Sequence, residues 1–215
     1  MATSLDATYC KLRSRLRVLD SAFERHLFVP SKTRRIDRFA LQEGLISGLW
    51  QSWCAFCRST VIGSARGTIS GSGQNITSPY AGRSEMEIAY VAKLLAQGKS
   101  VSKIRALHGS HLEPTWGDLT KANLIVTGIE STNQAQLLTA FGGGFAIKDL
   151  QLCRNASAHL TKDLLRDVNA AKVRYSETRA AHPSDLMFWV DPATKDFLWK
   201  SWLDEILLIA GHAIA

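Results

Sequence analysis

Residues 147–170 read IKDLQLCRNASAHLTKDLLRDVNA and have the clearest helical periodicity in the chain. One stripe of mostly apolar and small residues recurs every three or four positions: Leu150, Cys153, Ser157, Leu160, Leu164, Val168 and Ala171. A second stripe recurs in the same way: Lys148, Leu152, Asn155, His159, Lys162 and Arg166. Because each residue turns a helix by about 100°, the stripes lie on opposite faces of one predicted long helix. We expect the first stripe to pack on a helical bundle and the second to face outward.

The other periodic stretches of the chain also predict helices. They cover residues 5–29, 32–63, 84–97, 132–141 and 192–210. Ser84 and Glu87 form a capping box at the start of one of them, and Pro30 and Ser31 are predicted to end the first. Residues 119–128 fit either a short helix or a strand, because Leu-Ile-Val-Thr is common in both. The chain therefore predicts an all-α, up-and-down helical bundle with long loop insertions.

Two stretches between the predicted helices lack periodicity. Residues 64–83 are rich in glycine and serine and predict a flexible loop, which is a lid, a partner-binding loop or disordered. Residues 99–117 predict an irregular polar insert with a helical turn at 101–107. The glycines at 142–144 predict a hinge between helices, although a glycine loop at a helix N-terminus also suits an anion. The length fits a single domain over residues 1–215.

Composition narrows the kind of partner. The formal net charge is +7 and the isoelectric point is about 9.4, which favours an acidic partner, nucleic acid before membrane. A basic protein with no such partner is the alternative. Arginines and a lysine interrupt the N-terminal residues, so no signal peptide is expected, and no apolar run approaches the roughly 20 residues of a membrane span. We therefore expect a cytoplasmic protein without a membrane partner.

Four cysteines are expected to be free thiols in a reducing compartment. Cys54 and Cys57 form a CxxC pair, close enough on a helix to share a metal or a disulfide. A zinc site would need two further ligands, for which His108 and His111 are the candidates. Their spacing fits no common zinc module, so buried thiols are favoured. The sequence predicts no metal and no cofactor.

The segment from Arg154 to His159 carries a resemblance to a known family. Arginine, a polar residue and a histidine five positions after the arginine resemble the signature of HEPN domains, nearest the RiboL-PSP type of bacterial HEPN proteins. HEPN domains are all-helical, and many are metal-independent ribonucleases that work as dimers. The resemblance therefore implies an endoribonuclease of single-stranded RNA, acting as a toxin or antiviral-defence effector, with an antitoxin or regulatory protein as a further partner.

The residues themselves suit that chemistry. Histidine can move the proton of a 2′-hydroxyl or of a leaving 5′-oxygen, and arginine suits phosphate oxygens. The predicted catalytic residues are Arg154, Asn155 and His159, and the predicted RNA-binding residues are Lys148, Lys162 and Arg166. One copy supplies one histidine, so a homodimer with a composite site would provide both acid and base.

The motif also fits other geometries and other functions. In an ideal helix Arg154 lies about 140° around the helix axis from His159. The two can act together if the Arg154 side chain wraps around the helix or if the helix is distorted. Otherwise Arg154 acts with the histidine of the partner copy. A catalytically silent HEPN module that binds RNA or protein, and a helical adaptor with a coincidental motif, fit the same residues.

Overall fold

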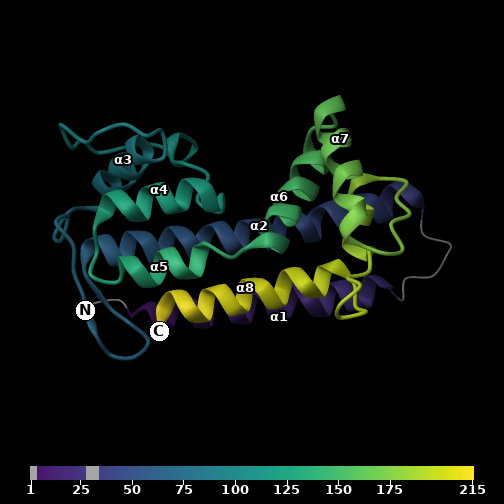
Figure 1. Ribbon diagram of the computed structural model, residues 1–215, viewed down its shortest axis with the longest axis horizontal. Helices are drawn as coiled ribbons and strands as arrows, with labels where there is room; N and C mark the ends of the chain where they lie inside the picture. Colours follow the sequence, from purple (N-terminus) through teal and green to yellow (C-terminus); the bar gives the residue numbers. More distant parts are fainter. Residues whose placement is uncertain (1–3, 28–33) are drawn as a thin grey trace. The chain divides into compact units, whose positions relative to one another are not determined.

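The computed structural model describes residues 4–27 and 34–215 (Figure 1). Within these ranges the fold is all-α, as predicted, and its one sheet is a short hairpin of β1 (Thr68–Ile69) and β2 (Asn75–Ile76). The α-helices are α1 (Leu5–Leu27), α2 (Arg35–Arg66), α3 (Glu85–Leu95), α4 (Leu119–Ile129), α5 (Gln134–Phe141), α6 (Phe145–Ala158), α7 (Lys162–Ala171) and α8 (Leu198–Ile214). Three 3₁₀ turns are η1 (Ser110–Leu112), η2 (Lys172–Arg174) and η3 (Pro183–Phe188). The HEPN-like, up-and-down arrangement stays a prediction.

The chain forms two compact units made of separate segments. Unit 1 comprises Met1–Arg13, Trp53–Gly144 and Leu208–Ala215. Unit 2 comprises Ser14–Ser52 and Phe145–Leu207, so it contains α6 and α7. Among the described residues no helix is long and apolar enough to cross a membrane.

The core of unit 1 forms around Trp53, which is fully buried in α2. Its ring stacks on Phe56 and meets the edge of Phe141, and its indole N–H donates to the carbonyl of Gly117 at 3.1 Å. A buried indole needs a hydrogen-bond acceptor, and this one is supplied by the residue just before the N-cap of α4. The side of α2 that carries Trp53 is thus a packing face.

The core of unit 2 is also aromatic. Phe23 of α1 is fully buried and stacks on Trp199 of α8 and on Phe188 of η3. The indole N–H of Trp199 donates to Asp20 at 3.1 Å, and Lys200 pairs with the same carboxylate at 2.6 Å. These contacts join the first and last helices within this unit.

Residues 147–170 are two helices and not one, which corrects the prediction. Thr161 is the N-cap of α7, with extended backbone and a hydroxyl that accepts a hydrogen bond from the Leu164 amide at 3.3 Å. A threonine at the N-cap stabilises the start of a new helix. Asp163, in the first turn of α7, stabilises the same helix N-terminus because its negative charge lies near the positive end of the helix dipole. Leu160, predicted on the packed stripe, is 64% exposed because it lies in the break.

Other helix boundaries follow local capping. The predicted capping box is present: the Glu87 amide donates to Ser84 Oγ at 3.3 Å, and the Ser84 amide donates to Glu87 Oε2 at 3.0 Å. Residues 119–128 are helical, with Asp118 as N-cap. The last helix begins at Leu198 and not at residue 192. Residues 191–196 form a turn instead, which is closed by a hydrogen bond from the Asp191 amide to the carbonyl of Asp196.

The predicted loops contain short ordered elements. The 64–83 stretch holds the end of α2 and the hairpin, and the amide of Gly71 donates to the carbonyl of Ile214 at 2.6 Å. A Cβ at Gly71 would lie 3.1 Å from that oxygen, so glycine permits this close approach. The insert has its helical turn at η1 and not at 101–107. Ile36 is 72% exposed in the first turn of α2. Pro30 and Ser31, which are predicted to end the first helix, lie outside the described residues.

Candidate functional site

Arg154 and Asn155 lie in the last turns of α6, and both are half-buried. The guanidinium of Arg154 donates from Nη1 to Asn155 Oδ1 at 3.1 Å. Arg154 also lines a hollow of about 160 Å³ within unit 2, together with Glu43, Ile46, Ser47, Ser157 and Ala158. A guanidinium beside two hydroxyl-bearing residues offers several donors to an oxyanion.

His159 follows the last residue of α6 directly. Its amide donates to the carbonyl of Asn155 at 2.8 Å, which extends the helical hydrogen bonding by one residue. The side chain is exposed, and its ring takes part in no hydrogen bond or ion pair with any other described residue. No hydrogen bond joins Arg154 to His159, and His159 does not line the hollow. The structure thus brings Arg154 and Asn155 together and leaves His159 as a neighbour at the helix end.

The three predicted RNA-binding residues are exposed. Lys148 Nζ lies 5.5 Å from the centroid of the Phe145 ring, which is a cation–π geometry. Lys162 is the first residue of α7. Arg166 pairs with Asp163 at 3.3 Å and with Asp167 at 3.8 Å, which offsets part of its charge. Exposed pairs of this kind are weak, so Arg166 can exchange them for a phosphate.

A buried carboxylate on α6 was missed by the sequence analysis. Asp149 is only 5% exposed and accepts hydrogen bonds from the Arg174 guanidinium and the Tyr175 hydroxyl. Burial is the main cause that raises the pKa of Tyr175, and the hydrogen bond to the Asp149 carboxylate is the second cause. This hydroxyl therefore keeps its proton and remains a donor. The contacts hold α6 to the η2 turn. The sequence did contain a signal for this site: Asp149 directly precedes Leu150, which belongs to the stripe predicted to pack.

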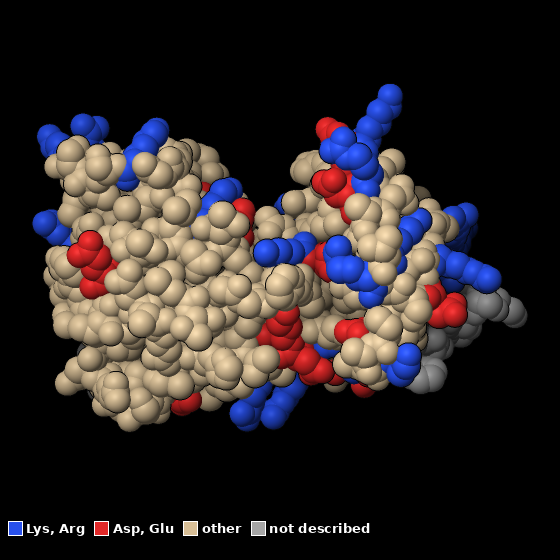
Figure 2. Space-filling model, in the orientation of Figure 1, with Lys and Arg blue, Asp and Glu red and all other residues tan. Residues whose placement is uncertain are grey.

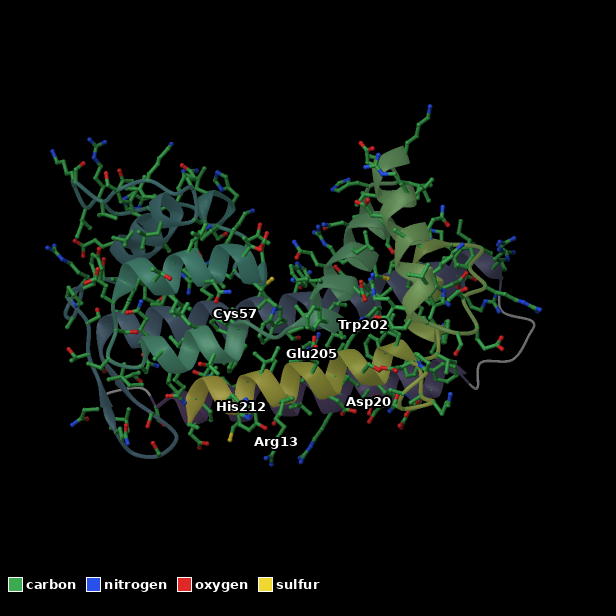
Figure 3. The ribbon with its side chains drawn as sticks, in the orientation of Figure 1. Arg13, Asp20, Cys57, Trp202, Glu205 and His212 are labelled. Atoms are coloured by element: carbon green, nitrogen blue, oxygen red, sulfur yellow. The ribbon has the colours of Figure 1, made fainter. Side chains whose placement is uncertain are left out.

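The N-terminus of α6 already has an anionic partner. Glu205 projects from α8 (Figure 3), and its two carboxylate oxygens accept from the amides of Phe145 and Ile147 at 3.0 and 2.7 Å. This carboxylate occupies the place that the glycine loop before α6 offers to an anion. Burial raises the pKa of Glu205, although the α6 amides oppose that shift.

The cysteines form no evident ligand set. Cys57 is fully buried, and burial raises the pKa of its thiol well above the usual value. Cys153 is buried on α6, where burial raises its pKa as well. Over the described ranges, no group of three or more His, Cys, Asp and Glu side chains is placed to hold a metal ion. His108 and His111 lie in the exposed insert.

Comparison of the chain with protein-family models, with curated proteins and with solved structures found no match.

Proposed function

We propose that this protein is a metal-independent endoribonuclease that cleaves single-stranded RNA through Arg154, Asn155 and His159. The observation that supports the proposal best is the accessible end of α6, where a half-buried guanidinium opens to a hollow and an exposed imidazole follows five residues later. Cleavage needs a group that moves protons and a cation that stabilises the phosphorane, and these two side chains supply both.

The proposed reaction transfers two protons. Histidine accepts the proton of the ribose 2′-hydroxyl, whose oxygen attacks the adjacent phosphorus and forms a cyclic phosphate. The bond to the 5′-oxygen breaks, and a protonated histidine donates its proton to that leaving oxygen. Arg154 stabilises the charge on the non-bridging oxygens, and Asn155 orients the Arg154 guanidinium through their 3.1 Å hydrogen bond.

One chain offers one histidine for two roles, so we propose a homodimer in which each copy contributes His159 to a shared cleft. Exposed apolar side chains elsewhere in unit 2 support a partner surface: Phe145 is 77% exposed, Leu160 is 64% exposed and Val173 is 86% exposed. Lys148, Lys162 and Arg166 would contact RNA at the rim, where their like charges are not forced together. The resemblance to HEPN proteins further suggests a toxin or antiviral-defence effector in the cytoplasm, with an antitoxin or regulatory protein as partner.

A catalytically silent module that binds RNA or protein is the second candidate. Glu43 lines the same hollow as Arg154, and its carboxylate would repel a phosphate there. In this candidate the hollow binds a partner and the histidine is a surface residue.

Labelled single-stranded RNA separates the two candidates. The nuclease should cut in EDTA and leave a cyclic phosphate, and His159→Ala should lower the rate at saturating RNA by on the order of 10²–10⁴. Because His159 is exposed, the variant should unfold at the same denaturant concentration as the wild type. RNA that is bound and never cut selects the silent module. A His159→Ala protein that cuts at the wild-type rate would end the proposed role of this residue.

A further inference from the structure

A second basic surface lies in unit 1, whereas the residues of the proposed site belong to unit 2. The chain has no acidic residue between Glu87 and Glu113, although this stretch holds four cations: Lys93, Lys99, Lys103 and Arg105. Lys99, Lys103 and Arg105 are exposed, as are His108 and His111 in the same insert. Figure 2 shows lysine and arginine side chains gathered over the part of the molecule that carries α3 and the insert.

The neighbouring acidic residues do not neutralise this surface. The Glu113 carboxylate accepts hydrogen bonds from Arg58 Nε at 2.7 Å and Arg58 Nη2 at 2.9 Å. It also accepts one from the Trp116 indole N–H at 2.7 Å. Glu85 pairs with Arg58 and Arg66, and Glu87 pairs with Arg83. None of the ion pairs in residues 4–27 and 34–215 includes a cation of the acid-free stretch. Carboxylates and cations are thus segregated, and the insert keeps its charge.

The insert has anchored ends and a defined course. Gly98 leaves α3 with a φ of +68°, and the Leu107 amide donates to the carbonyl of Met86 at 3.0 Å. At the far end, Glu113 is held by Arg58 of α2, and Trp116 is buried. A loop held at three places presents its cations with less ordering cost than a free chain would incur.

We infer that residues 99–111 form a binding surface for the phosphate backbone of RNA, separate from the cleavage site. The inference rests on the proposed function for the choice of RNA as the ligand. Lysine and arginine contacts to phosphates give affinity without sequence preference, and histidines add hydrogen-bonding groups. A membrane surface would require apolar side chains exposed among the cations. Within residues 99–111 the large apolar side chains Val101, Ile104 and Leu107 are half-buried, and Leu112, which follows this stretch, is 40% exposed. One such side chain offers little apolar area to a membrane, which favours the nucleic acid.

The test measures RNA binding apart from RNA cleavage. Every protein is full length and carries His159→Ala, so a fluorescent single-stranded RNA stays intact during anisotropy titrations. The insert variant adds Lys99→Ala, Lys103→Ala and Arg105→Ala. The control variant instead adds Lys11→Ala, Arg13→Ala and Arg17→Ala, which removes three exposed cations from α1. Denaturant unfolding of each protein checks the fold.

The insert variant should bind RNA about 10- to 100-fold more weakly at 0.1 M salt, because three phosphate contacts contribute about 2 to the logarithmic salt slope. The control should change affinity by less than about threefold. Equal losses in the two variants, or no loss in the insert variant, would overturn the inference. So would loss of binding to phosphatidylserine vesicles with unchanged RNA affinity. If the insert variant loses RNA binding but the wild-type protein, which has His159, never cuts RNA, this inference stands and the proposed nuclease activity is rejected.

Discussion

Removal of Arg174 should expose the cost of the buried Asp149 charge. Asp149 is 5% exposed, whereas the Arg174 side chain is 52% exposed, so the two partners respond differently to loss of the other. In Arg174→Ala the carboxylate keeps only the Tyr175 hydroxyl. Breaking a buried pair costs about 3–5 kcal/mol, and the remaining hydrogen bond reduces that to about 2–4 kcal/mol. In Asp149→Asn the guanidinium turns to water, and the expected loss is about 1–2 kcal/mol.

The two changes should not add. Once Asp149→Asn has removed the charge, Arg174→Ala leaves no unpaired charge buried, so the double variant should be more stable than Arg174→Ala alone. The measurement is the free energy of unfolding from urea titrations at neutral pH, followed by circular dichroism. Arg179→Ala is the matched control, because Arg179 is exposed and nearby in the chain, and it should change stability by less than about 0.5 kcal/mol. If Arg174→Ala costs no more than Arg179→Ala, the reasoning about the buried carboxylate is refuted.

Four further variants test the site and its supports. Arg154→Lys should lose cleavage at saturating RNA while its urea unfolding stays unchanged, because an ammonium lacks the bidentate fork. Lys162→Ala should reduce the logarithmic salt slope of RNA binding by about 0.7 and spare the cleavage rate, and an unchanged slope would remove it from the RNA surface. Thr161→Ala should cost about 0.5–2 kcal/mol and speed amide exchange in α7, whereas wild-type exchange would show that the cap is dispensable. Burial raises the pKa of Glu205, so the folded protein keeps this proton to a higher pH than the unfolded chain does. Its contribution to stability is present below the unfolded pKa and is lost as pH rises through the folded one. The stability of wild type relative to Glu205→Gln, from urea titrations between about pH 4 and 7, should therefore fall with pH, and a rise would contradict the sign.

The helices were predictable because their signals are local. Ser84 and Glu87 are three residues apart, and the capping box they form is the one the sequence indicates. Trp53 is buried because apolar residues recur at helical spacing around it, and a tryptophan in such a stripe packs inward. The all-α fold follows from the same periodicity.

The sequence predicts which residues form the candidate site, and that choice stays a prediction; the structure adds where these residues lie. The spacing of Arg154, Asn155 and His159 identifies three accessible polar side chains at the end of α6. The direction of each side chain depends on where the helix ends. Thr161 caps the start of α7, and α6 therefore ends before it. The apolar pattern continues through this break, so the pattern did not predict that the helix stops there.

By itself, the sequence determined the all-α class, the capping box at Ser84 and Glu87, the basic charge and the polar residues of the motif, since these depend on composition or on neighbours a few positions away. The tertiary structure alone decided that Glu205 meets the start of α6, that Arg174 and Tyr175 meet Asp149, and that Arg58 meets Glu113. These partners are 25 to 60 residues apart in the chain. Local patterns indicate that a charge needs a partner, but only packing of distant segments selects which one it finds.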